Sequence, residues 1–109
     1  MAKTNSDQLH GTLDMLVLKV LASGPQHGYW IATRLEQLSA EVLRVEEGSL
    51  YPALYRMEAR GWISSEWAMT EKKRRARFYR LTRTGRLQLE AETESWARLT
   101  AAVNGVLSS

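Results

Sequence analysis

Apolar residues recur along the first part of the chain at the spacing of one helix face. They stand at positions i, i+4, i+7, i+8, i+11 and i+12 and comprise Leu9, Leu13, Leu16, Val17, Val20 and Leu21. This spacing predicts an amphipathic helix over residues 9–21. The sequence Ser23-Gly24-Pro25 ends it, because glycine suits a C-terminal cap and proline cannot continue a helix. Residues 1–8 are predicted to be a flexible N-terminus.

A second, shorter helix is predicted from residues 27–28 to about residues 39–40. Its apolar face comprises Ile31, Leu35 and Leu38. Residues 42–45, which begin and end with the β-branched Val42 and Val45, follow it and predict a small strand.

A third helix is predicted to begin close to Ser49. Serine is a good N-cap, and Pro52 is tolerated only in the first turn of a helix, where its missing N–H has no partner. Its buried face comprises Leu50, Leu54 and Met57, and Gly61 ends it.

The last third of the chain predicts a β-hairpin and then a long helix. Residues 62–69 and 77–81 are rich in aromatic and β-branched side chains, and the polar run 70–75 lies between them. Thr82 then caps a helix that extends to about Leu107. Its apolar residues follow a heptad-like spacing, which Glu92 interrupts, and comprise Leu89, Trp96, Leu99, Val103 and Val106.

This order of elements is that of a winged helix-turn-helix. The sequence therefore predicts an α+β fold, mainly α, with a winged helix-turn-helix over residues 9–81 and a C-terminal helix over residues 82–109. In this architecture the third helix is the recognition element and the hairpin is the wing.

Composition narrows the class of protein. With 109 residues, 44% hydrophobic and 25% charged, the chain is expected to be one globular domain with an appended element. The absence of cysteine excludes disulfides and thiolate chemistry. No apolar run could cross a bilayer and the first residues do not resemble a secretory signal, so we expect a soluble cytoplasmic protein.

Charge is concentrated on the hairpin. Eight of the fifteen basic residues lie between Lys72 and Arg86, whereas residues 87–109 hold one arginine and three glutamates. Such a cluster predicts one surface for a polyanion. An anionic membrane is a poor match, because the cluster has no apolar insertion face beside it.

Both DNA-reading elements of a winged helix carry suitable side chains. The outer face of the third helix is expected to comprise Ser49, Tyr51, Pro52, Ala53, Tyr55, Arg56 and Arg60. Small residues let a helix approach base edges, Arg56 can reach a guanine or a phosphate, and tyrosine hydroxyls suit phosphate oxygens. The wing supplies Lys72, Lys73, Arg74, Arg75 and Arg77, which suit a phosphate backbone or a minor groove.

The sequence His27-Gly28-Tyr29 has two interpretations. At a helix N-terminus, His27 and Tyr29 can bind a phosphate with backbone N–H groups and a hydroxyl. Alternatively, they cap and pack the helix locally.

The strings HGY, GSLYPALYRME and YRLTRTG occur together in this chain. This combination resembles the PadR family of bacterial transcriptional regulators, over roughly residues 9–107. The resemblance implies a short-subgroup member whose helix 82–109 forms a two-fold dimer that binds a palindromic operator, usually to repress transcription. Dimer contacts are then expected from Leu89, Trp96, Leu99, Val103 and Val106.

Some members of that family bind flat aromatic compounds between their C-terminal helices. The resemblance implies a stacking position at Trp96, with Thr100 beside it and a pore edge formed by Asp14, Met15 and Leu18. A tryptophan at heptad spacing is, however, more often part of a dimer core than a ligand platform.

Other classes of function remain as alternatives. A small-molecule sensor and a winged helix that binds an acidic protein are both compatible with the sequence. Catalysis is not expected, because the chain has no HExxH, GxSxG, P-loop or dinucleotide motif, and no metal or cofactor is implied.

Overall fold

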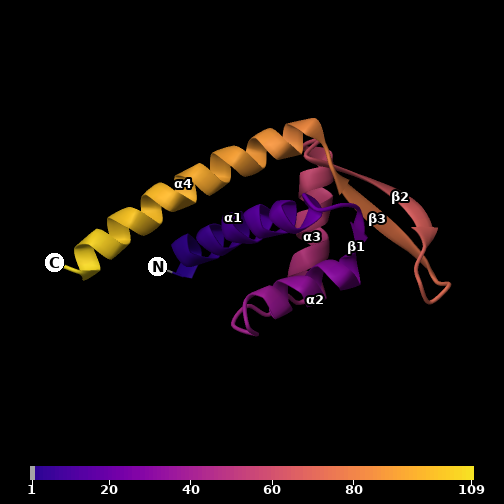
Figure 1. The fold of residues 1–109 in the computed structure, drawn as a ribbon, viewed down its shortest axis with the longest axis horizontal. Helices are drawn as coiled ribbons and strands as arrows, with labels where there is room; N and C mark the ends of the chain where they lie inside the picture. Colours follow the sequence, from indigo (N-terminus) through magenta and orange to yellow (C-terminus); the bar gives the residue numbers. More distant parts are fainter. Residues whose placement is uncertain (1) are drawn as a thin grey trace.

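The chain forms four helices and a small antiparallel sheet (Figure 1). The computed structural model describes residues 2–109, with side chains from Gly11 onward. The elements are α1 (Ala2–Leu21), β1 (Gln26–His27), α2 (Gly28–Leu38), α3 (Glu47–Ala59), β2 (Ile63–Met69), β3 (Arg75–Leu81) and α4 (Arg83–Leu107). The strand order is β1-β3-β2, with both pairings antiparallel. This is the predicted winged helix-turn-helix followed by a long helix.

The third strand is not where the sequence predicted it. Residues 42–45 form no strand, whereas Gln26 and His27 pair with Tyr79 and Phe78 of β3. The chain turns sharply before residues 42–45, because Ala40 and Glu41 both have positive φ, and Val42 is then left 80% exposed. Val42 and Val45 favour a strand locally, but no neighbouring strand among the described residues offers backbone groups with which they could pair.

Helix α1 is also longer than the apolar pattern indicated. It includes residues 2–8, and Met1 lies outside the described residues. The flexibility expected of this N-terminal segment stays a prediction.

The core lies where α1, α2 and α3 meet the base of the sheet. Its fully buried large side chains are Val17, Leu18, Leu21, Ile31, Leu50, Leu54, Met57 and Ile63. The predicted inner face of α3 is confirmed, but Ala53, expected on the outer face, is also fully buried. Position 53 follows Leu50 by three residues and precedes Leu54 by one, so it belongs to the same helix face. Leu38, expected in the core, is 62% exposed at the end of α2.

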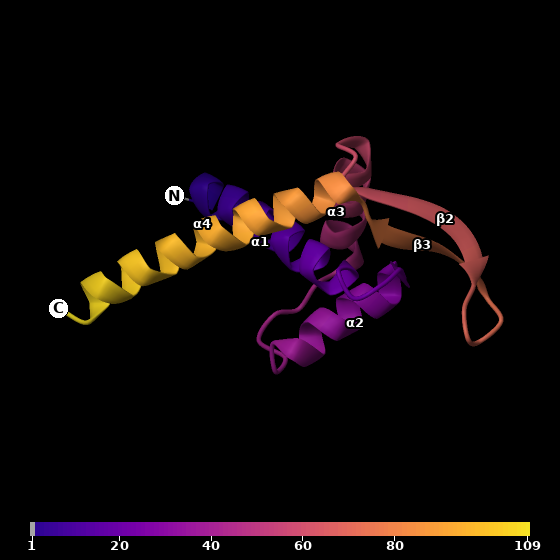
Figure 2. The ribbon, with the colours of Figure 1, turned by 45° about the horizontal axis from the view of Figure 1, so that its top comes forward.

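Helix α4 is anchored at the base of the wing by Thr82. Its hydroxyl oxygen accepts a hydrogen bond from the Gly85 N–H at 3.0 Å and lies 2.6 Å from the Gly61 carbonyl oxygen, to which it donates. Gly85 packs directly on the Trp62 carbonyl, where a β-carbon would not fit. From this anchor α4 crosses α1 and extends well beyond the winged helix, as Figure 2 shows.

Candidate nucleic-acid interface

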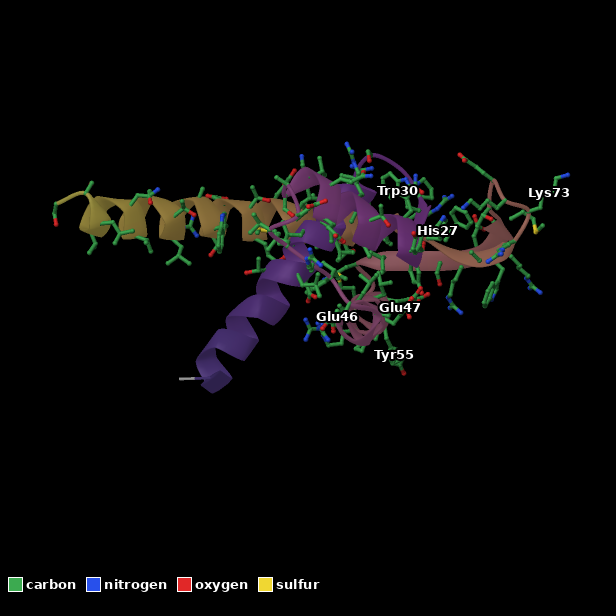
Figure 3. All side chains as sticks on the ribbon, turned by 90° about the horizontal axis from the view of Figure 1, so that it is seen from below. His27, Trp30, Glu46, Glu47, Tyr55 and Lys73 are labelled. Atoms are coloured by element: carbon green, nitrogen blue, oxygen red, sulfur yellow. The ribbon has the colours of Figure 1, made fainter. Side chains whose placement is uncertain are left out.

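The outer face of α3 presents polar and aromatic side chains to solvent. Ser49 and Pro52 are exposed, Tyr51 is 44% exposed and Tyr55 is 73% exposed. Figure 3 shows Tyr55 pointing away from the helical body. These positions match the outer face expected from the sequence and leave it open to a groove.

The sequence His27-Gly28-Tyr29 builds the N-terminus of α2. His27 is its N-cap, and the His27 Nδ1 accepts a hydrogen bond from the Trp30 N–H at 3.4 Å. The His27 ring also meets Phe78 edge to face, with 5.3 Å between centroids. These contacts favour local capping and packing for His27. Tyr29 is 73% exposed and keeps its hydroxyl available.

Arg56 forms an ion pair that the sequence did not predict. Its Nη2 lies 3.1 Å from Oδ1 of Asp14, a buried carboxylate on α1. The pair joins α3 to α1 across 42 positions of sequence, a separation at which local patterns carry no signal. Arg56 is therefore held toward α1 rather than extended from the outer face of α3.

The expected pore edge on α1 needs correction. Leu18 is a core residue with no exposed surface, and Asp14 is buried against Arg56. Helix periodicity explains this: Asp14, Val17, Leu18 and Leu21 share the face that packs on the rest of the domain. Met15 is half-buried.

The wing tip is a tight turn closed by Thr70. The Thr70 N–H donates to the Arg74 carbonyl at 2.7 Å, and the Arg74 N–H donates to the Thr70 hydroxyl at 3.2 Å. Lys73 adopts φ 59° at the apex and lies at the far end of the molecule in Figure 3. Lys72, Lys73 and Arg74 are all exposed, so the tip carries three cations free of tertiary packing.

A polar network ties the wing to α3. The Ser65 hydroxyl donates to Glu58 Oε2 at 2.6 Å, and Arg77 Nε donates to the same hydroxyl at 2.7 Å. Arg77 Nη2 also lies 3.6 Å from Glu58 Oε2. One residue from each of α3, β2 and β3 therefore fixes the angle between helix and hairpin. Arg77, expected only as a phosphate contact, has this positioning role.

The distal part of α4 leaves its apolar side chains uncovered. Trp96 is 47% exposed, Leu99 51%, Val103 45% and Val106 73%, whereas Leu89 packs partly against the core. Thr100 is exposed on the same helix.

Glu92 lies between the covered and the uncovered parts of α4. Its Oε2 is buried and, within residues 11–109, has no hydrogen-bond partner. Burial raises the pKa of Glu92, the hydrogen bond from Gln88 opposes this, and the carboxylate of Asp14 raises the pKa further.

The described residues contain no group of histidine and acidic side chains that could hold a metal ion. None of the described helices is long and apolar enough to cross a membrane.

Residues 17–91 match the sequence profile described as the "Transcriptional regulator PadR-like family". The chain belongs to the PadR-like family. The profile covers the end of α1, all of α2 and α3, the wing and the first part of α4, whereas Asp14 and the exposed apolar residues from Trp96 to Val106 lie outside it. As a PadR-like protein the chain is a transcriptional regulator and not an enzyme.

The chain is also similar to individual proteins. The chain is 35% identical over 89 residues to the transcriptional regulator Rv3488 of Mycobacterium tuberculosis, covering 82% of this chain and 79% of that one. It is 46% identical over 89 residues to an uncharacterized 37.1 kDa protein in transposon TN4556 of Streptomyces fradiae, of which it spans only 24%. The crystal structure of a PadR-like transcriptional regulator from Bacillus cereus superposes with a TM-score of 0.81 at 28% identity, covering 94% of this chain and 98% of that one.

Proposed function

We propose that the chain is a homodimeric repressor that binds a palindromic DNA operator. Helix α3 enters the major groove through Ser49, Tyr51, Pro52 and Tyr55, and the wing tip contacts the flanking backbone or minor groove. The observation that carries this proposal is the Glu58–Ser65–Arg77 network, because it holds an open helix face and a cationic hairpin as one rigid unit. Repression itself rests on the resemblance to short PadR-type regulators.

The remaining cations suit the edges of such an interface. Arg60 is exposed and its guanidinium lies 5.1 Å from the centroid of the Trp62 ring. Lys72, Lys73 and Arg74 extend from the wing tip without tertiary contacts. These residues are proposed to contact phosphates, whereas Arg56 is proposed to hold α3 in place through Asp14.

Dimerisation is proposed to occur through α4. Helix α4 extends past its own domain and exposes a run of apolar side chains. Such an apolar surface is unfavourable in water unless a partner buries it. A second copy supplies it with matching chemistry, and a two-fold axis then makes the contact self-complementary. Such a dimer places two α3 helices on half-sites about one helical turn, ~10 bp, apart or a small multiple of it.

Selection of binding sites from random duplex DNA tests the proposal. We expect the purified protein at near-physiological salt to enrich a palindrome with roughly one-turn spacing between half-sites. Sedimentation of the same sample is expected to give a dimer. Salt-labile binding without any enriched motif would contradict the proposal and favour a protein or small-molecule partner.

A second candidate function is release of the operator by a flat aromatic ligand. Trp96 favours it, because its ring is 47% exposed amid apolar neighbours on α4 and can stack on a planar molecule. Met15 and Thr100 remain candidate lining residues. Planar cationic dyes are expected to quench tryptophan emission in the wild type and not in Trp96→Ala, and equal quenching in both would exclude this site.

A further inference from the structure

The face of the wing that is turned toward α3 carries an unusual pair of exposed apolar side chains. Ser65 faces α3, because its hydroxyl donates to Glu58. Successive side chains of a strand point to opposite faces, so Trp67 and Met69 lie on the same face as Ser65. Trp67 is 55% exposed and Met69 is 62% exposed.

Two arginines flank this apolar strip. Arg77 is the cross-strand partner of Trp67, and Arg75 is the partner of Met69, so both share the face. The guanidinium of Arg75 lies 5.1 Å from the centroid of the Trp67 ring, and that of Arg77 lies 5.9 Å away. Cation–π contacts at these distances hold the indole beside the two charges.

The opposite face of the hairpin has a different character. Glu66 and Arg80 form an ion pair there, at 3.7 Å. Phe78 on that face packs against His27. Positive charge beside open aromatic surface is thus confined to the face toward α3.

We propose that this face is a second DNA contact, in which the Trp67 indole packs on deoxyribose while Arg75 contacts the adjoining phosphate. The inference rests on the proposed function and adds an apolar contact to it. The Arg75–Trp67–Arg77 group repels cationic partners, and its alternation of charge and apolar ring matches the alternation of phosphate and sugar along a DNA strand. An acidic protein would supply negative charges for the two arginines, but it has no sugar ring on which the Trp67 indole could pack.

Duplex DNA is favoured as the occupant by the position of the face. Tyr55 is exposed on α3 and Lys73 lies at the wing tip, and the Glu58–Ser65–Arg77 network joins α3 to the part of the hairpin that carries Trp67. In the proposed complex, a DNA strand that runs from α3 to the wing tip would pass along this face. Trp67 is therefore placed against the backbone that separates the two grooves.

The two side chains are expected to respond differently to salt. Packing of an indole on a sugar releases no counterions, so Trp67→Ala should weaken operator binding by about tenfold at every salt concentration with an unchanged log–log slope. Arg75→Ala should reduce that slope by about 0.9, the value for one phosphate. Arg80→Ala is the matched control, since it removes the same side chain from the same strand on the opposite face.

The test is fluorescence anisotropy of the selected operator duplex across a salt series. Melting curves and sedimentation of each variant establish that it is folded and has the wild-type oligomeric state, and Trp67→Phe provides a milder second variant. In protein labelled with 5-fluorotryptophan, the ¹⁹F resonance that is absent in Trp67→Phe is expected to shift on addition of operator.

The outcomes separate the two proposals. If wild type binds the operator but Trp67→Ala and Arg75→Ala bind like Arg80→Ala, and the fluorine resonance stays in place, the inference is wrong while the proposed function stands. If wild type binds no duplex, both are wrong. Binding of an acidic protein through Trp67 in place of DNA would also overturn the inference.

Discussion

The ring of Tyr51 lies on the α-carbon of Gly28. A β-carbon at position 28 would stand 2.7 Å from the Tyr51 hydroxyl oxygen and 2.9 Å from Cε1 of the ring. The contact joins the N-terminus of α2 to α3 and sets how far Tyr51 projects from α3. It also gives a physical reason for glycine in the sequence His27-Gly28-Tyr29.

Substitution of Gly28 by alanine is therefore expected to displace Tyr51. The added methyl group overpacks the contact, and we expect Gly28→Ala to lower the free energy of unfolding by about 1–3 kcal/mol. Urea denaturation measures this. Gly48→Ala is the matched control, because a β-carbon at position 48 of α3 has no neighbouring atom within 4 Å and should be neutral or stabilising. Equal stabilities of the two variants would show that Tyr51 moves aside without cost.

Loss of the Arg56–Asp14 ion pair is expected to affect stability more than sequence preference. Arg56→Ala removes a charged hydrogen-bond donor from the buried carboxylate of Asp14, which typically costs about 1–3 kcal/mol. Chemical denaturation measures the loss of stability, and site selection with the variant tests whether the preferred DNA sequence is unchanged. A motif altered at one base pair would instead make Arg56 a direct base reader.

The wing tip is expected to act through charge alone. Lys73→Ala combined with Arg74→Ala should flatten the dependence of log affinity on log salt by about 0.9 for each phosphate lost. The selected motif should stay the same, because phosphate contacts carry no base information. Affinity measured from low to physiological salt checks both points, and a changed motif would mean that the tip reads bases.

Protonation of Glu92 is expected to stabilise the fold. Because burial raises its pKa in the folded state, the ionised carboxylate weakens folding at neutral pH. That loss is relieved as pH falls through the raised folded-state pKa and is gone below the ordinary glutamate value of 4.5. Glu92→Gln should therefore melt at a higher temperature than wild type at pH 7 and lose this advantage in acid. Glu90→Gln, at an exposed position of the same helix, is the control. Parallel melting profiles for wild type and Glu92→Gln from pH 7 to pH 4 would contradict the prediction.

The apolar face of α4 is expected to hold the dimer. Val103→Asp places a charge within the exposed run of Trp96, Leu99 and Val106, where a second copy would bury it. Sedimentation should then show monomers with an unchanged helical circular dichroism spectrum. Ala101→Asp on the same helix is a useful comparison. If neither Val103→Asp nor Ala101→Asp dissociates the dimer, the dimer contact lies elsewhere.

The helices could be predicted from the sequence because their signals are local. Periodicity identified Leu50, Leu54 and Met57 as one buried face, and Thr82 marked the start of α4, where its hydroxyl accepts from the Gly85 N–H. Such patterns depend on neighbours within one or two helical turns. The burial of Ala53 was missed because alanine suits either face of a helix.

Contacts between distant segments could not be predicted in the same way. The strand at Gln26 exists because β3 offers it an edge, and residues 42–45 lack one despite their composition. The pairing of Asp14 with Arg56 and the Glu58–Ser65–Arg77 network depend on how α1, α3 and the hairpin are packed. Each joins residues that have no periodic relationship in the sequence.

The anchor of α4 at Thr82 has a mechanical consequence. Only that one residue separates β3 from α4. Gly85 packs directly against the Trp62 carbonyl, so the start of α4 has little room to move relative to the wing. At 1.5 Å per residue, the 25 residues of α4 make a stiff lever about 37 Å long with the wing as its short arm. In the proposed dimer, a change in the crossing angle of two such levers would alter the span between the two wings while both helix-turn-helix units stay internally unchanged.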